Sequence, residues 1–234
     1  YAVGKINENQ LKEMEHNACP GCGACSGMFT ANSMNCLTEV LGLGLPGNGT
    51  IPAVTGERIA LAKHAGMAVM NLYKKGITAR SMMTAENFRN ALAADMALGC
   101  SSNTMLHVPA IAHEAGLEID LHEVNEISNR TPNLCHLAPA GHTFMCELND
   151  AGGVQAVLAE LAKKNLINTS LITATGKTIA ENLEGVRNRN PEILRPIDNP
   201  FSENGGLAIL FGNLAPNGTV VKRSACAKEL LHHT

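Results

Sequence analysis

The sequence predicts an α/β protein in which a helix-rich region comes first and a β-rich unit begins near residue 205. Apolar residues recur at helical spacing over most of residues 26–183, whereas two short runs of strand type follow on either side of a turn at 206–222. A polar, proline-punctuated segment at 185–204 separates the two patterns and is interpreted as a linker. We therefore place a domain boundary near residue 200.

Each helix in the first region is predicted from the spacing of apolar residues and from its end signals. Thr84 is a suitable N-cap, and Gly76 is a typical helix end. The predicted helices lie at 26–42, 55–75, 84–98, 105–115, 121–129, 151–164 and 178–183. In the second of them the expected buried side consists of Ile59, Leu61, Ala62, Met67, Val69, Met70 and Leu72. Residues 1–18 are interpreted as a connection, and 171–173 as a strand.

The β-rich unit is predicted from two strand-like runs, Gly206–Phe211 and Thr219–Lys222, with a turn at Pro216–Gly218 between them. Two strands do not form a stable β domain alone, so we expect further strands beyond Thr234. The sequence also opens at Tyr1 without a methionine. We expect it to be a piece of a longer polypeptide.

Composition excludes several classes of function. The chain has 18 Lys+Arg against 21 Asp+Glu, for a net charge of -3, and only 3% aromatic residues, which disfavours a nucleic-acid partner. It has neither a long apolar run nor a signal-like start, so no membrane partner is expected. Its eight cysteines are unevenly spaced, as in proteins of a reducing compartment, and we expect a cytoplasmic location.

Three cysteines, Cys19, Cys22 and Cys25, lie three residues apart in a glycine-containing loop and predict metal or redox chemistry. The spacing favours an iron–sulfur site, although a ferredoxin run would have a fourth cysteine where Phe29 stands. Zinc ligation and unliganded thiols stay open as alternatives. The positive N-terminus of the helix predicted to follow Cys25 would favour a thiolate-bound, anionic cluster.

A second candidate site is the small polar segment Ser101, Ser102 and Asn103, which opens a predicted helix. Its side chains suit helix capping, which is common at such positions. The free amides of the helix could also face a substrate carboxylate. Both interpretations stay open.

Five segments, taken in order, resemble the dihydroxy-acid dehydratase family, within the superfamily that also contains phosphogluconate and sugar-acid dehydratases. They cover nearly the whole chain: Ala18–Met34, Leu45–Gly49, Gly99–His107, Ala151–Val154 and Gly205–Gly218. Cys22 and Cys25 favour the dihydroxy-acid branch over the phosphogluconate branch. Cys100 and Cys146 depart from the usual pattern.

The resemblance implies part of a cluster-binding α/β/α N-terminal domain at residues 1–200, linker 185–204 included, followed by the first strands of a β-barrel domain at 205–234. It implies a hydro-lyase that dehydrates 2,3-dihydroxy carboxylates to 2-keto acids in valine and isoleucine biosynthesis. The implied cofactors are an iron–sulfur cluster, 2Fe-2S or 4Fe-4S, and Mg²⁺. A homodimer is also expected.

The same resemblance assigns the cluster ligand of this loop to Cys19 and makes Cys22 and Cys25 its neighbours. The other cluster cysteines, the magnesium ligands and the serine base are expected outside this chain, so the 234 residues alone are expected to be inactive. Three alternatives stay open. They are a sugar-acid or phosphogluconate dehydratase, an iron–sulfur electron-transfer module that uses all three cysteines, and a remnant that keeps the fold without the activity.

Overall fold

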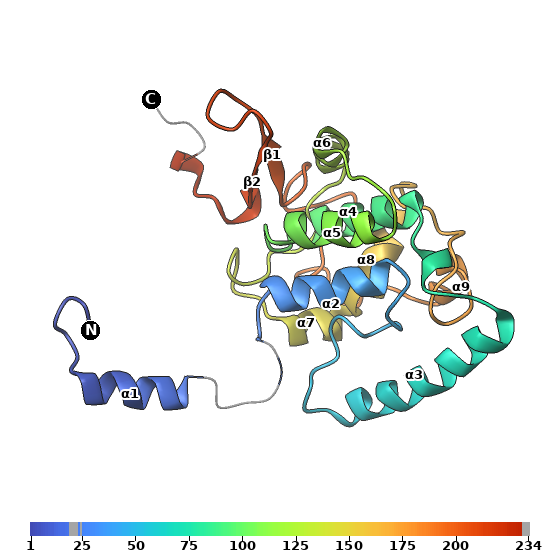
Figure 1. The fold of residues 1–234 in the computed structure, drawn as a ribbon, viewed down its shortest axis with the longest axis horizontal. Helices are drawn as coiled ribbons and strands as arrows, with labels where there is room; N and C mark the ends of the chain where they lie inside the picture. The colour runs from blue at the N-terminus through green and yellow to red at the C-terminus, as the bar shows by residue number, and fades with distance from the viewer. Residues whose placement is uncertain (19–22, 24, 231–234) are drawn as a thin grey trace.

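The computed structural model describes residues 1–18, 23 and 25–230 (Figure 1). Helices account for most of the regular structure, and one two-stranded sheet lies near the end of the described chain. The helices are α1 (Glu8–Asn17), α2 (Thr30–Val40), α3 (Gly56–Lys75), α4 (Ala85–Leu98), α5 (Thr104–Glu114), α6 (Leu121–Arg130), α7 (Met145–Ala151), α8 (Gly153–Ala162) and α9 (Ile179–Asn182). Short 3₁₀ turns lie at Arg80–Met82, Arg223–Ala225 and Lys228–Leu230, and the strands are β1 (Ala208–Leu210) and β2 (Thr219–Val221).

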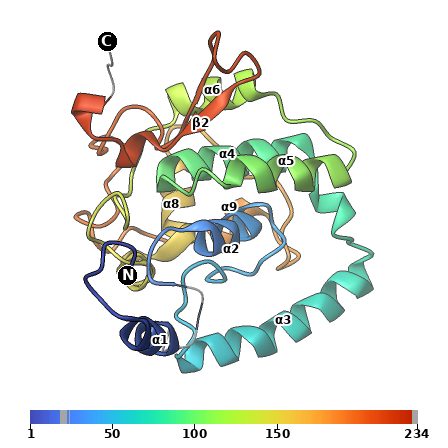
Figure 2. The ribbon, with the colours of Figure 1, turned by 60° about the vertical axis from the view of Figure 1, so that its left-hand side comes forward.

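Helix α4 is the centre of the core. It begins as predicted, because the Thr84 side chain accepts a hydrogen bond from the Asn87 amide, and it ends at Gly99, whose φ is 61°. The helix is buried without interruption from Asn90 to Leu98. Helices α2, α5, α6 and α8 all pack against it, so most of the molecule is arranged around this one element (Figures 1 and 2).

Helix α2 begins at Thr30, later than the predicted start at residue 26. The residues before it are held by backbone hydrogen bonds to other segments: the Met28 amide donates to Ala138 O at 2.7 Å, and the Met145 amide donates to Ser26 O at 2.8 Å. These tertiary bonds keep 26–28 out of the helix. Residues 26–28, which follow the cysteine loop, are therefore held against the segments around Ala138 and Met145 before α2 begins.

Helix α3 has the predicted bounds but not the predicted burial, because none of its residues is buried. Ile59, Met67, Val69 and Met70, all expected in the core, are 53–64% exposed. Both ends of the helix are tied down, by the Arg58 guanidinium, which donates to Asn48 O at 3.1 Å and also to Ile51 O, and by the Lys75 ammonium, which donates to Gly176 O at 3.1 Å. The middle lies away from the other helices (Figure 2).

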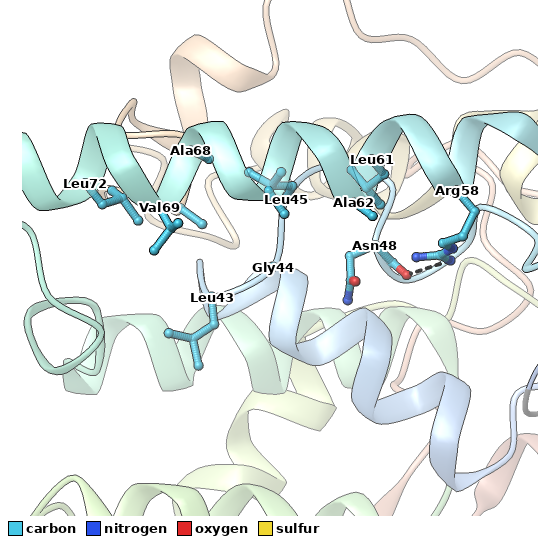
Figure 3. Close-up of a pocket in the computed structure, with 12 residues that line it drawn as sticks. Leu43, Gly44, Leu45, Asn48, Arg58, Leu61, Ala62, Ala68, Val69 and Leu72 are labelled. Atoms are coloured by element: carbon cyan, nitrogen blue, oxygen red, sulfur yellow. Dashed lines mark hydrogen bonds between the residues drawn. The ribbon is translucent and has the colours of Figure 1, made fainter.

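A cavity of about 360 Å³ lies between α3 and residues 43–48 (Figure 3). Its lining is mostly aliphatic: Leu43, Leu45, Leu61, Ala62, Ala65, Ala68, Val69, Leu72 and Ala174, with Gly44, Asn48 and Arg58. Leu61, Ala62, Val69 and Leu72, which were expected to pack on the core, line this cavity instead.

Strands β1 and β2 form an antiparallel hairpin as predicted, with Ile209 opposite Val220. Gly218, with φ 93°, lies just before β2 in the predicted turn. The segment 185–204, interpreted as a linker, packs on the body, because Leu194 and Ile197 are buried and Leu194 forms an isolated bridge with Cys135.

Two further expectations were wrong. Residues 8–17 form α1 rather than an irregular connection, since Asn7 and Gln10 make a reciprocal capping box. Residues 171–173 contribute only an isolated bridge from Ile172 to Thr178 rather than a strand, because no strand among the described residues extends the pairing. Within the described residues, no helix is both long and apolar enough to cross a bilayer.

Candidate cofactor and substrate site

The N-termini of α2 and α5 lie next to each other and are joined by side-chain hydrogen bonds. The Ser101 amide donates to Ser33 Oγ at 2.9 Å, and Asn103 Nδ2 donates to Thr30 Oγ1 at 2.6 Å. The hydroxyls of Thr30 and Ser101 are 3.4 Å apart. The residues after the cysteine loop and the 99–103 turn were predicted as separate sites. In the structure they lie next to each other and form one site.

Cys25 lies at the edge of this site, and its side chain is exposed. Asn32, in the first turn of α2, holds the backbone around it: Asn32 Nδ2 donates to Cys25 O at 2.8 Å and to Gly27 O at 2.7 Å, and it lies 3.3 Å from Cys25 Sγ. Gly27 has no room for a side chain, because an added Cβ would lie 2.8 Å from Ala138 O. The thiol is thus fixed in direction while remaining accessible.

Cys19 and Cys22 lie outside the described residues. In the part of the chain that is described, no group of three His, Cys, Asp or Glu side chains could hold a metal ion. The residues present nevertheless suit an anionic group, since the N-cap of α2, Phe29, makes no side-chain cap bond and leaves the first amides of the helix available. The described residues fit one edge of a cluster site.

The 99–103 turn presents polar groups at the start of α5. Ser101 Oγ accepts from the Asn103 amide at 3.2 Å, whereas Asn103, the N-cap residue, makes no side-chain cap bond. Ser102 is half-buried and has no side-chain hydrogen bond with another described residue. Simple capping therefore does not explain Ser102, whose side chain remains available for a ligand, whereas the Asn103 side chain is held by Thr30.

The inner side of the turn is buried. Cys100 Sγ lies 3.8 Å from Met28 Sδ, and burial raises the pKa of this thiol well above its ordinary value. The thiol therefore stays protonated and is a packing group rather than a ligand. Cys100, which departs from the family pattern, therefore packs against Met28 in the segment after the cysteine loop.

Asp95, which the sequence did not single out, is fully buried beneath the turn. Burial raises the pKa of Asp95 to about 7, against the opposing effects of the hydrogen bond from Thr104, of the neighbouring Cys100 side chain and of the Lys222 charge. Its place on a helix with apolar neighbours gave no sign of this, because in sequence an Asp in the last turn of a helix resembles a surface residue. Lys222, at the end of β2, is brought here only by the tertiary structure.

Comparison with known proteins agrees with the resemblance noted above. The model of the dihydroxy-acid/6-phosphogluconate dehydratase N-terminal domain matches residues 1–182, and that of the C-terminal domain matches residues 192–234. The chain is 61% identical to a dihydroxy-acid dehydratase of Clostridium beijerinckii over 233 residues and 63% identical to one of Lachnoclostridium phytofermentans. Each match covers 100% of this chain and 42% of the relative, so the chain spans less than half the length of these relatives. The chain belongs to the dihydroxy-acid/6-phosphogluconate dehydratase family.

Proposed function

We propose that this chain takes part in the dehydration of 2,3-dihydroxy carboxylates to 2-keto acids, the hydro-lyase step of valine and isoleucine biosynthesis. The observation that carries the proposal is the meeting of the α2 and α5 N-termini beside Cys25, joined through Thr30, Ser33 and Ser101. Relatives at 60–63% identity bear the name dihydroxy-acid dehydratase, which favours this substrate class over phosphorylated or longer sugar acids.

In this proposal Cys19 holds an iron–sulfur cluster, with Cys25 as a neighbour. When bound, the cluster supplies a Lewis-acidic iron for the departing 3-hydroxyl, and Mg²⁺ supplies a cation for the carboxylate and the 2-hydroxyl. The chain's own contribution is orientation. The uncapped amides of α2 favour negative charge, Asn32 fixes the Cys25 backbone, and the 99–103 turn offers donors to the substrate carboxylate.

The role of the turn is tested by Ser102→Ala in the holoenzyme. The Ser102 side chain makes no hydrogen bond with another described residue and only its backbone carbonyl accepts one, from the Met105 amide, so loss of the hydroxyl leaves the fold unchanged, whereas loss of one donor to a carboxylate raises KM by about tenfold. Steady-state kinetics and a thermal melt measure the two effects separately. Ser81→Ala, in the 3₁₀ turn Arg80–Met82, is the control: it should leave KM unchanged and lower only the Tm, because it loses hydrogen bonds with Thr78.

If Ser102→Ala leaves KM unchanged and lowers only the Tm, the turn is structural and the substrate site lies elsewhere. The reaction class is checked separately by supplying a short branched 2,3-dihydroxy acid and a phosphorylated sugar acid to the same preparation. Turnover of the sugar acid alone would contradict the proposed substrate.

The cluster assignment is tested by anaerobic reconstitution with iron and sulfide. A Cys19→Ser variant should lose the visible absorption of the cluster, whereas Cys22→Ser and Cys25→Ser should retain it. Loss in all three variants, with a stable cluster on the 234-residue chain itself, would instead support an electron-transfer module. Incorporation of zinc in place of iron would contradict both interpretations.

We also propose a cytoplasmic homodimer. The six described cysteines are free thiols, as is usual in a reducing compartment. The dimer is expected from the family alone, and light scattering on the purified protein measures it directly. A monomer at micromolar concentration would contradict that expectation.

A further inference from the structure

Three buried polar atoms around the 99–103 turn lack a hydrogen-bond partner among the described residues. They are Asp95 Oδ1, Lys222 Nζ and Ser224 Oγ. An unpaired buried polar atom costs about 1–3 kcal/mol, so three around one turn require an explanation. They come from two parts of the chain, α4 and the segment after β2, and neither part accounts for them alone.

On the α4 side, Asp95 connects both ends of the turn. Its carboxylate Oδ2 accepts from Thr104 Oγ1, the first residue of α5, at 2.8 Å. Its backbone carbonyl accepts from the Cys100 amide at 3.2 Å. The position of Asp95 therefore determines how α5 follows α4 and where Ser101–Asn103 are presented.

On the other side, the segment after β2 is held close to the same turn. The Ser224 amide donates to Gly206 O at 3.1 Å, and Ser224 O lies 3.1 Å from His136 Nε2. Gly206 approaches so closely that an added Cβ would lie 2.4 Å from the Cα of Gly99. This close contact between the two backbones places Lys222 on the inner side of the turn.

Charge and geometry together indicate what joins the two sides. Lys222 is the cation that acts on the Asp95 carboxyl, yet their charged atoms do not approach within the 4.0 Å of a direct ion pair. A bridging water that accepts from the ammonium and donates to the carboxylate, with the Ser224 hydroxyl as a third partner, is the kind of link that such unpaired buried atoms require.

We propose that Asp95 and Lys222 form a buried, water-bridged charge pair that fastens the segment after β2 to the α4–α5 turn and so positions Ser101–Asn103. Lys222 is in this view a positioning residue, because it acts on the turn through Asp95. The pair is independent of the reaction, whereas its effect on substrate rests on the proposed function of the turn.

The other titratable groups near Asp95 do not replace Lys222. The Cys100 and Cys36 thiols have pKa values raised well above their ordinary range by burial, and Thr104 and Ser224 carry no charge. His136 faces the backbone of Ser224 rather than the carboxyl. Above pH 7 the ionised Asp95 therefore depends on Lys222 for its compensating charge, whereas at pH 5 it is protonated and does not.

The test is the pH dependence of Lys222→Met in two backgrounds. Without Lys222 the Asp95 carboxyl can take up a proton at pH 8, one unit above its pKa of about 7, so we expect Lys222→Met to lower the Tm at pH 8 by about 3–6 °C more than at pH 5. At pH 5 the loss should be at most about 4 °C. In an Asp95→Asn background the difference between the two pH values should disappear, because no carboxylate remains to be compensated.

Hydrogen exchange locates the effect. In Lys222→Met at pH 8, amides of the 99–106 and 219–226 peptides should exchange about tenfold faster, while peptides from α8 should be unchanged. Lys74→Met, at an exposed lysine of α3, is the control and should alter neither the Tm nor exchange at the turn. An equal Tm loss at pH 5 and pH 8, or the same loss in both backgrounds, would overturn the pair whether or not the enzyme turns over substrate.

The consequence for substrate is measured separately in the holoenzyme. If the turn binds substrate, Lys222→Met raises KM more at pH 8 than at pH 5. If the pair passes the Tm test and KM does not change at either pH, the charge pair stands and the substrate role of the turn fails.

Discussion

Helices α3 and α4 have similar sequence signals, but α3 is exposed and α4 is buried. Both were predicted from helical spacing, both have a threonine at the N-cap and both end at a glycine in the left-handed region. Yet α4 is buried without interruption from Asn90 to Leu98, whereas α3 has no buried residue over its whole length. The difference teaches that an apolar stripe predicts a helix but does not say whether anything covers it.

The two helices differ in burial because different numbers of helices pack against them. Four helices pack on α4, whereas α3 is tied down at Arg58 and Lys75 and encloses an apolar cavity between those two points. Because burial is what makes an apolar side chain stabilising, the same substitution should have very different costs in the two helices.

The largest difference is expected for aromatic side chains. Phe88→Ala in α4 removes a side chain that is 1% exposed and should lower the free energy of unfolding by about 3–5 kcal/mol. Tyr73→Ala in α3 removes one that is 80% exposed and should change it by less than about 0.5 kcal/mol. Urea unfolding measures both, and a cost for Tyr73→Ala near that of Phe88→Ala would show that α3 is covered in solution.

A buried acid should make α4 a source of pH-dependent stability. The pKa of Asp95 rises from its ordinary 3.8 to about 7 on folding, because burial disfavours the charged form. The native state therefore holds its proton more tightly, and the stability that this group contributes is full below pH 4 and is lost by about 4 kcal/mol as pH rises to 7. Asp95→Asn should flatten this part of the stability curve.

The matched variant for this curve is Glu57→Gln, in the exposed first turn of α3. It should leave the fall in stability between pH 4 and pH 7 in place. Chemical unfolding at several pH values gives both curves. A fall of equal size in Asp95→Asn would assign the effect to another group.

Helix caps give a smaller contrast. Thr84 accepts a hydrogen bond from the Asn87 amide, so Thr84→Ala should cost about 1 kcal/mol. Thr55, the N-cap of α3, makes no such bond and its hydroxyl donates only to Pro52 O, so Thr55→Ala should cost less than Thr84→Ala. Thermal melts of the two variants side by side would contradict the contrast if the Tm losses were equal.

The smallest expected effect has the opposite sign. Gly66 lies inside α3, and an added Cβ would meet nothing within 4 Å. Gly66→Ala should therefore stabilise the helix by about 0.5–1 kcal/mol through helix propensity. A destabilisation would reveal a close neighbour of α3 in solution.

The functional site shows the same division between local and tertiary information. The cysteine loop and the Ser101–Asn103 segment were each singled out by their composition, and the α2 start was misplaced by only a few residues. That the two segments meet through Thr30 and Ser33 was not predictable, because residues about 70 positions apart carry no mutual spacing signal. Asp95 and Lys222 were missed for the same reason.

By itself the sequence determined the family, the places of most helices, the hairpin and the two candidate segments, because capping, glycine ends and apolar spacing act over a few residues. It also carried the capping box of α1, which the periodicity argument overlooked. Only the tertiary structure decided that α4 is the core, that α3 stands apart and that Lys222 lies beneath the 99–103 turn. Burial and charge compensation depend on which distant segments come together, and that is a property of the whole packed chain rather than of any local pattern.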